Sequence, residues 1–522
     1  MKKLAIVLSV LTISAFTFSC SDKFDEIDTN PNSTDKPLTY GIFNSANKEF
    51  ADNYRGVWIS GRMILPWVQY SAQTGYTEED RYRYRLPASG DALWSISYRV
   101  AQDYKKIILL NTDPATKEQM AVYGPNVNQI AAARVMLAYV FLNLVDSYGD
   151  VPYYSYGNPD PDFQALDVDK NLQPKFASQQ KIYTDLLKEL KESAAMIDVN
   201  GKVFTQGDRL FGSGLKLKKF ANSLRLRIAT RVKGVIPGAD AQIADAIASG
   251  VMTSNADNVG LTYENNLVNP SPFFNDFRTR TDFAISKTFV QLLKGQKGLI
   301  QQDPRLFKYA SPVGTTQTAI VNGTSVETTD PAKIAGMPYG VASTVSASQE
   351  GTYSYFSKNI LKPDYTEILM EYSEVQFLLS EANGWSQINY INGVKASMER
   401  WGVPSADITT YVNSLPAANQ ENVITQKYIA LFMQPFEAWA EYRRTGFPKT
   451  LLLPGQTADL NVPTTTGQST YTFTSLIDGL TDLPTRIFYP TTVQNLNTEN
   501  YKAASAAIGG DKMNTKLIWD KN

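Results

Sequence analysis

Two facts of composition limit the chemistry that this chain can perform. Its 522 residues include one cysteine, Cys20, and no histidine. The lack of histidine excludes Ser-His-Asp and Cys-His nucleophilic arrangements, histidine-ligated zinc, and the commonest general base near neutral pH. No GxxxxGK[ST] or GxGxxG phosphate-binding loop is present either. Paired carboxylates of the kind that glycosidases use remain possible, but with 51 acidic residues no pair stands out from chance.

Cys20 directly follows an apolar segment at the start of the chain. Lys2 and Lys3 precede residues 4–18, which are apolar or small at nearly every position. A membrane-spanning helix needs ~20 such residues, so the segment predicts a signal peptide over residues 1–19. With Ser19 before it, Cys20 resembles the lipobox cysteine of bacterial lipoproteins, whose thiol receives a diacylglyceryl group. We therefore expect an acylated Cys20 to be the mature N-terminus and to hold the protein on a membrane.

The net charge of the chain is close to zero. The whole sequence has a formal charge of −1, which gives no reason to expect a nucleic-acid partner. No later segment is continuously apolar over the length that a membrane span requires, so no transmembrane helix is predicted. Residues 20–37 are rich in Asp, Asn, Ser and Thr and read as a lipidated tether, in which "SDKFDE" resembles the acidic export signal of surface lipoproteins in Bacteroidota. Residues 38–522 are expected to form a single domain.

Helical periodicity dominates this domain. In "NQIAAARVMLAYVFLNLVDSYGDVPYY", apolar residues recur every three or four positions on two faces, which predicts a helix buried on more than one side. A proline at position 435 should kink or restart the last predicted helix. Helices of this length joined by short loops indicate stacked hairpins of the tetratricopeptide type. The other helical patterns lie at 180–197, 215–232, 241–250, 366–385, 388–402 and 422–448.

Four stretches together resemble the SusD/RagB family of outer-membrane lipoproteins, in its SusD-like branch. They are the tether "FDEIDTNPN", the helix ending in "YGDVPYY", the pair "EYSEVQFLLSEA" and "QKYIALFMQPFEAWAEYRRTGFP", and "LPTRIFYPTTVQNLN" with its Arg-x-x-Tyr-Pro segment. They occur in family order along nearly the whole mature chain. Two departures are Pro435, where the family usually has glycine, and Val493, where it usually has glutamate.

The resemblance implies an all-α fold of about four helical hairpins in a right-handed superhelix, with a loop-rich second half packed against it. It implies a cell-surface protein of the outer membrane that binds an oligosaccharide or another small nutrient. The partner would be a SusC-like TonB-dependent transporter that imports the ligand. No catalysis, cofactor or catalytic metal is expected. The family's ligand site is built from variable loops, so its residues are not transferred by motif.

Ligand residues must therefore be chosen by their chemistry. A sugar site needs flat rings beside amide, carboxylate or guanidinium groups. The stretch from 58 to 94 is the densest mixture of these, and its Gly, Pro and Ser content predicts loop after a helical start. Within it, Trp58 and Trp94 flank helical patterns and are expected in the core. The candidate ligand residues are Trp67, Tyr70, Tyr76 and Arg81, with Phe273, Phe274 and Tyr353 from two later aromatic clusters.

Three functional interpretations follow. A nutrient-capturing lipoprotein accounts for the anchor, the hairpins and the aromatic loops, with a peptide as an alternative to a glycan. A surface glycoside hydrolase using two carboxylates accounts for the anchor and the rings but not for the hairpins. A repeat scaffold that binds only protein would need no aromatic loops. A glycan activity assay separates the first two, and an adjacent transporter gene separates the first from the third.

Overall fold

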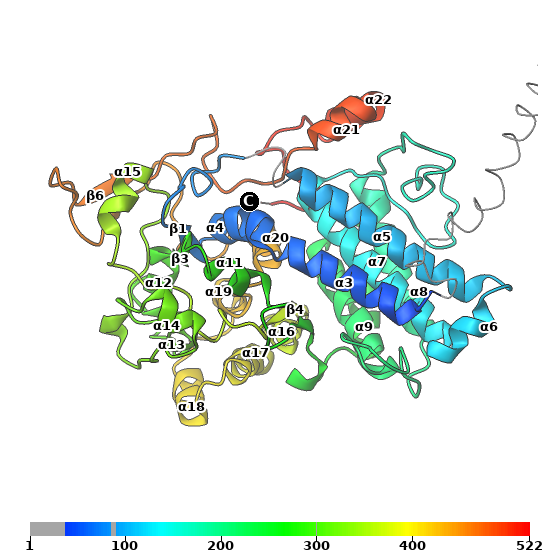
Figure 1. Cartoon of the computed structure of the whole chain (residues 1–522), viewed down its shortest axis with the longest axis horizontal. Helices are drawn as coiled ribbons and strands as arrows, with labels where there is room; N and C mark the ends of the chain where they lie inside the picture. Colours follow the sequence, from blue (N-terminus) through cyan, green and yellow to red (C-terminus); the bar gives the residue numbers. More distant parts are fainter. Residues whose placement is uncertain (1–36, 85–89, 299, 522) are drawn as a thin grey trace, which may run out of the picture.

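The computed structural model describes residues 37–84, 90–298 and 300–521. The expected signal peptide, Cys20 and residues 20–36 of the tether lie outside the described residues. The chain is mostly helical, with long helices gathered in one half and shorter helices and loops in the other (Figure 1). The predicted fold of helical hairpins with a loop-rich second half is therefore confirmed.

In the first half each long helix packs against the next long helix along the chain, and one short helix packs on the second long helix. In Figure 1 they lie side by side, from blue to green. The connections between them vary in length, and the one across residues 149–178 contains no helix. The helices are α3 (Thr39–Tyr54), α5 (Gly90–Thr112), α6 (Lys117–Met120), α7 (Asn126–Tyr148), α8 (Gln179–Met196), α9 (Gly214–Arg231) and α10 (Ala239–Ala248).

The second half adds further packed helices and many short elements. Its main helices are α16 (Tyr372–Ala382), α17 (Gln387–Arg400), α18 (Ser405–Asn413), α19 (Gln420–Ala430) and α20 (Pro435–Thr445). The short helices are α4 (Leu65–Trp67), α11 (Pro272–Phe277), α12 (Lys287–Leu293), α13 (Leu306–Tyr309), α14 (Gln317–Val321), α15 (Ser343–Ser346), α21 (Thr491–Leu496) and α22 (Thr498–Ala507).

Within the described residues, three two-stranded antiparallel sheets are an exception to the all-α expectation. Each sheet joins strands that are distant in the sequence or closes a loop. The strands are β1 (Ser71–Gln73) with β3 (Phe283–Ile285), β2 (Val259–Thr262) with β4 (Thr366–Met370), and β5 (Thr457–Asp459) with β6 (Thr470–Thr472).

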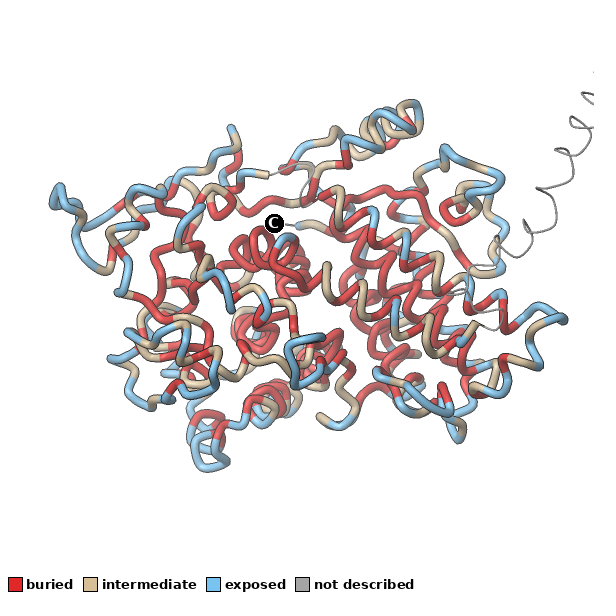
Figure 2. The backbone as a smooth tube through the Cα atoms, viewed as in Figure 1, coloured by how far each residue is buried: buried red, intermediate tan, exposed pale blue. Residues whose placement is uncertain are grey.

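Helix α7 lies at the centre of the first half. Every residue from Asn128 to Tyr148 is buried, as its two apolar stripes predict (Figure 2). Among the described helices it alone is long and apolar enough to cross a membrane. Because it is enclosed by α5, α8 and α9, its composition reflects its place in the core.

Pro435 restarts a helix, as expected. Helix α19 ends at Ala430, and Pro435 is the first residue of α20, where a missing backbone N–H leaves no helical hydrogen bond unmade. The helix ends at Thr445 and is capped by Gly446, whose φ of 73° is the left-handed conformation that glycine adopts at low cost. Arg443 and Arg444 occupy its last turn, where positive charge opposes the helix dipole.

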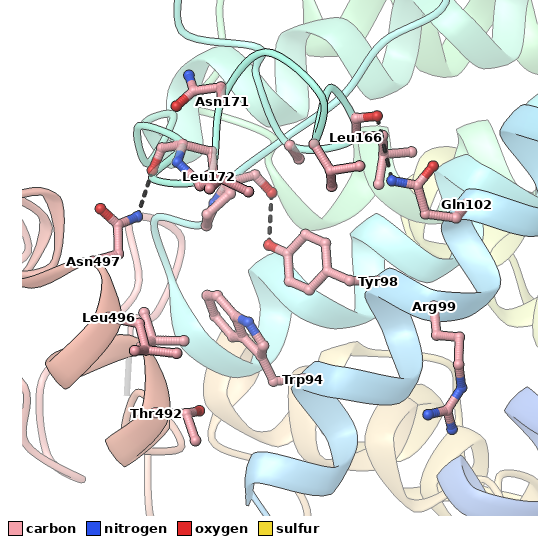
Figure 3. A pocket seen from close by; sticks show the side chains of 15 residues that line it. Trp94, Tyr98, Arg99, Gln102, Leu166, Asn171, Leu172, Thr492, Leu496 and Asn497 are labelled. Carbon is pink, nitrogen blue, oxygen red and sulfur yellow. Dashed lines mark hydrogen bonds between the residues drawn. The ribbon is translucent and has the colours of Figure 1, made fainter. Parts of the chain in front are cut away.

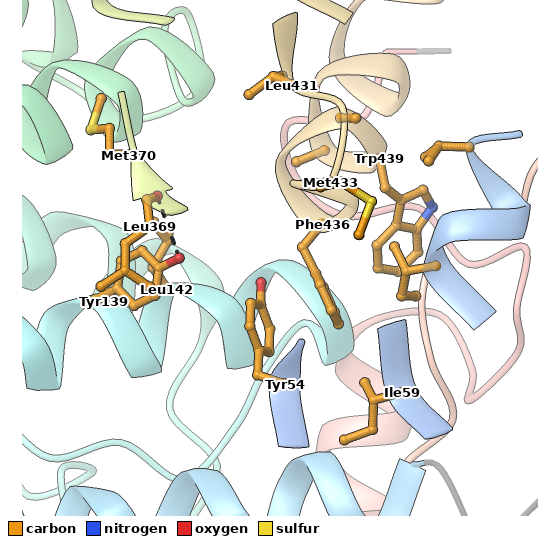
Figure 4. Packing of buried hydrophobic residues seen from close by; sticks show 14 of the residues in the cluster. Tyr54, Ile59, Tyr139, Leu142, Leu369, Met370, Leu431, Met433, Phe436 and Trp439 are labelled. Atoms are coloured by element: carbon orange, nitrogen blue, oxygen red, sulfur yellow. Dashed lines mark hydrogen bonds between the residues drawn. The ribbon is translucent and has the colours of Figure 1, made fainter. Parts of the chain in front are cut away.

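Rings and buried ion pairs join the two halves into one core. Tyr54 of α3 stacks on Phe436 of α20 with 4.0 Å between ring centroids (Figure 4). Arg227 of α9 donates to Glu374 of α16 over 2.7 Å, and both side chains are almost wholly buried. Removing one partner of such a pair leaves an uncompensated buried charge, at a cost of about 3–5 kcal/mol.

The Arg-x-x-Tyr-Pro segment is part of this scaffold. Arg486, fully buried, donates to the Tyr148 carbonyl from Nε and Nη2 over 3.0 and 2.9 Å, and it also pairs with Asp511. The Tyr489 hydroxyl donates to the Asp150 carbonyl over 2.7 Å. The "YGDVPY" corner and the Arg-x-x-Tyr-Pro segment, which lie far apart in the sequence, therefore hold each other in place.

Candidate functional site

Two of the predicted ligand residues belong to the core. Trp67 is 0% exposed and packs edge-on against Trp439, with 5.4 Å between ring centroids. Tyr70 is equally buried, stacks on Tyr428 and donates to its carbonyl. The sequence predicted an exposed loop around Trp67 and Tyr70, and this prediction is wrong. Trp67 ends α4, which directly follows a π-helical turn, and the chain folds back into the core here. A fully enclosed ring offers no face to a ligand.

The later aromatic candidates are corrected in the same way. Phe273, Phe274 and Tyr353 are all buried. The Phe273 ring packs against Gly61, where an added Cβ atom would lie 3.3 Å from it, and against the Phe283 ring. The Phe273 ring therefore fills space beneath β3 and the π-helical turn, and none of the three buried rings forms a surface for a ligand.

Tyr76 and Arg81 have different surroundings. The Tyr76 ring is 55% exposed, as the prediction requires. Arg81 is half-buried, and its carbonyl accepts a hydrogen bond from the Leu476 amide over 2.8 Å. Of the four candidates in this stretch, only Tyr76 presents an exposed ring.

The sequence interpretation missed a second exposed ring. Trp58, expected in the core, is 56% exposed, whereas Trp94 is buried as expected. The Arg62 guanidinium lies 4.5 Å from the centroid of the Trp58 ring. A cation at this distance is attracted to the face of an indole and restricts its motion. Trp58 is therefore an exposed ring with a charged side chain beside it.

Tyr76 has an equivalent neighbour, and a single carboxylate links the two pairs. The Arg280 guanidinium lies 5.9 Å from the centroid of the Tyr76 ring. Asp282 accepts hydrogen bonds from Arg280 over 2.7 Å and from Arg62 over 2.9 Å. We call these five residues, Trp58, Arg62, Tyr76, Arg280 and Asp282, the two-ring platform.

Local backbone structure places the platform residues. Trp58 and Arg62 lie on the π-helical turn η1 (Val57–Ile64), a rare geometry that is frequent at functional sites. Tyr76 and Arg280 lie just beyond the paired strands β1 and β3. Thr74 continues that pairing, because its amide donates to the Asp282 carbonyl over 2.9 Å and its hydroxyl to the Thr281 carbonyl over 2.7 Å. The two loops that carry the platform are thus fixed to each other.

Arg62 and Arg280 both pair with Asp282, so the platform carries a net charge of +1. Burial, together with the negative charge of Asp282, raises the pKa of the nearby Asp276 carboxyl. The hydrogen bond from Arg280 to Asp282 raises the pKa of the Arg280 guanidinium. Two cations therefore share one carboxylate. Across the described residues, no group of three or more Asp, Glu, His or Cys side chains is arranged to hold a metal ion.

An apolar groove lies elsewhere, between α5, the 152–174 loop and α21. It has a volume of about 440 Å³ and is lined by Trp94, Leu172 and Leu496, among others (Figure 3). Two of its polar groups are engaged: the Tyr98 hydroxyl donates to the Pro152 carbonyl over 2.7 Å, and the Asn497 amide donates to the Pro174 carbonyl over 2.7 Å. Val493, the departure from the family pattern, adds to the apolar wall. The groove offers few polar groups for sugar hydroxyls.

Comparison with known proteins places the chain in a family. Residues 31–467 match the SusD-like model described as "Starch-binding associating with outer membrane", and residues 416–520 match the one described as "Susd and RagB outer membrane lipoprotein". The chain belongs to this SusD-like family, whose members are described as outer-membrane lipoproteins. The resemblance drawn from the four sequence stretches is confirmed.

Solved structures agree with this assignment. A chitin-binding protein is 26% identical, with a TM-score of 0.72 over 93% of this chain and 100% of its own. A SusD homologue from Parabacteroides distasonis is 21% identical, with a TM-score of 0.72 over 93% and 98%. A chitin-binding SusD homologue from Flavobacterium johnsoniae is 20% identical, with a TM-score of 0.69 over 93% and 99%. No curated protein matches the sequence significantly.

Proposed function

We propose that this chain captures an oligosaccharide at the cell surface on the two-ring platform and passes it to a TonB-dependent outer-membrane transporter. The observation that carries the proposal is the pair of exposed rings, Trp58 and Tyr76, each with a guanidinium beside it. The family description supports it, because it names starch binding at the outer membrane.

The platform suits the two kinds of surface on a sugar. A pyranose ring presents C–H groups on its faces, and these pack on an aromatic ring. Its hydroxyl groups lie at the edges, where the N–H groups of Arg280 and the second carboxylate oxygen of Asp282 can hydrogen-bond to them. Because Asp282 holds both guanidiniums, the binding groups are ordered before a ligand arrives, which lowers the entropy lost on binding.

The neighbours suggest which glycan to test first. The chitin-binding protein is similar over its whole length, so chito-oligosaccharides are the first candidates for this chain. Malto-oligosaccharides follow from the starch-binding description of the family. A peptide remains the alternative ligand class.

The same proposal includes the anchor, the partner and the absence of catalysis. An acylated Cys20 would hold the protein on the outer surface, beside the transporter. Asp282 is engaged by two guanidiniums, which favours a binding role over a nucleophilic one. A hydrolase using Asp276 and Asp282 is the competing interpretation.

One experiment addresses binding and catalysis together. Purified mature protein is titrated with chitohexaose and with maltohexaose by calorimetry, and the same mixtures are then assayed for new reducing ends. We expect saturable binding of one of the two glycans and no cleavage. Cleavage at ~1 per second or faster, a rate typical of enzymes, would show a hydrolase instead. Absence of binding to either glycan, together with binding of peptides on a parallel peptide array, would show the alternative ligand class.

A further inference from the structure

A second open space on the described chain lies away from the platform. It is an open cleft of about 840 Å³ between α18, the segment around α13 and the loop at 327–329. Figure 1 shows α13 and α18 beside each other in the loop-rich half. We call it the α18 cleft. Its size is within the range of ligand sites, roughly 300–1,000 Å³.

A buried chain of hydrogen bonds holds the two walls of the α18 cleft together. Beneath the first wall, Arg305 is fully buried, pairs with Asp303 over 2.6 Å and donates to Gln426 over 2.6 Å. Gln426 then donates to the hydroxyl of Tyr411, which belongs to α18, over 2.7 Å. The walls cannot separate without breaking these buried bonds, so the cleft is preformed.

The surface of the cleft combines apolar rings with unused polar groups. Phe307, Pro304 and Pro404 supply the apolar area. Within the described chain, the side chains of Gln301, Gln302, Thr329 and Asp407 line the cleft and make no hydrogen bond to the protein. Two amides, a hydroxyl and a carboxylate therefore face one space with both donors and acceptors available.

The charges in the cleft narrow the class of ligand. Lys308, the one cation among its lining residues, pairs with Glu327 over 3.2 Å. Asp407 then leaves the cleft with a negative charge, which disfavours an acidic ligand. Neutral hydroxyl-rich molecules with apolar faces fit both the amides and the rings.

We infer that the α18 cleft is a second binding site, for a neutral oligosaccharide. This inference rests on the proposed function for the class of ligand but concerns different residues. With two sites, one protein holds two segments of a polysaccharide, and the second binding event becomes intramolecular. Long chains are then retained better than short ones.

The test uses purified mature protein titrated by calorimetry with chitohexaose and maltohexaose. We expect two hexasaccharides to bind per chain, and one after Trp58→Ala. A double variant, Gln302→Ala with Asp407→Ala, should lose the other site, with at least about tenfold weaker binding there, because it removes two side chains that would hydrogen-bond to the sugar. Both changed residues are exposed, so folding should not suffer. Gln180→Ala, an exposed glutamine on α8, is the matched control and should leave both sites intact.

The outcomes separate this inference from the proposed function. One binding event that Trp58→Ala abolishes and the double variant leaves unchanged would refute the second site and leave the platform standing. One event that the double variant abolishes and Trp58→Ala leaves unchanged would support the cleft and refute the platform. No binding of either hexasaccharide, or of neutral glycans on an array, would refute both.

Discussion

The Arg62 guanidinium lies 4.5 Å from the Trp58 ring centroid and is itself held by Asp282 over 2.9 Å. An exposed ring is thus connected through a cation to a carboxylate that also holds Arg280, beside Tyr76. Each ring is linked to the carboxylate through its own arginine. Asp282 therefore acts as a positioning residue for both halves of the platform.

Asp282→Asn should weaken glycan binding about tenfold, because a neutral amide holds the two guanidiniums less tightly than a carboxylate does. Calorimetric titration of the variant measures this. Asp240→Asn, on the exposed face of α10, is the matched control and should leave affinity unchanged. Unaltered affinity in Asp282→Asn would mean that the arginines need no such anchor.

Arg486→Lys should lower the free energy of unfolding by about 2–4 kcal/mol, since a lysine cannot reproduce the bonds to the Tyr148 carbonyl and to Asp511 together. Urea denaturation measures the loss. The same substitution at the exposed Arg209 should change little. If Arg486→Lys were as stable as Arg209→Lys, the Arg-x-x-Tyr-Pro segment would have no structural role.

Glu367 should make stability depend on pH. Burial raises the pKa of its carboxyl to about 7, so between the usual pKa and that value the folded state retains a proton that the unfolded state releases. The stabilising effect of this proton is full below the usual pKa and is lost as pH rises to about 7. Glutamine at this position is neutral at every pH. The free energy of unfolding of Glu367→Gln, relative to that of the unmodified protein, should therefore rise by about 3 kcal/mol between pH 4 and pH 8.

The control for this pH dependence is Glu499→Gln, at an exposed position on α22. Its stability should follow that of the unmodified protein at every pH. If the difference in unfolding free energy between Glu367→Gln and the unmodified protein stays constant from pH 4 to pH 8, the Glu367 carboxyl of the folded protein does not have a raised pKa in this range.

Cys20→Ser should release the protein from the membrane, because the acyl chains attach through the thiol. Detergent-phase partitioning of cell fractions measures the change. The unmodified protein should enter the detergent phase and the variant should remain in the aqueous phase. A variant that still partitions with detergent would show that another segment anchors the chain.

The helices could be predicted from the sequence because their signals are local. The apolar periodicity of α7 and the restart at Pro435 depend on residues within a few positions of each other. The platform could not be predicted in the same way. Trp67 is buried by Trp439, from the far end of the chain, whereas Trp58, in the same aromatic stretch, faces outward. Which ring of a mixed segment meets solvent is decided by distant partners.

The signal for the missed residues was nevertheless present in the sequence. Arg280 and Asp282 lie in "RTRTDF", at the end of the aromatic cluster from which Phe273 and Phe274 were chosen. Phe273 and Phe274 were predicted to bind ligand because they lie in a Pro-bounded segment, but aromatic rings in such segments also pack into protein cores. The charged residues after them form the surface, because β3 pairs with β1 and brings them beside Tyr76.

The most direct test compares Trp58→Ala with Trp67→Ala in ligand affinity and in unfolding free energy. Trp58→Ala should reduce platform affinity for the bound hexasaccharide by roughly thirtyfold, or ~2 kcal/mol, with an unchanged melting temperature. Trp67→Ala should destabilise the fold by about 3–5 kcal/mol and leave the affinity of the remaining folded protein unchanged. Full affinity at the platform in Trp58→Ala, or lost affinity in a Trp67→Ala protein that is still folded, would contradict the account.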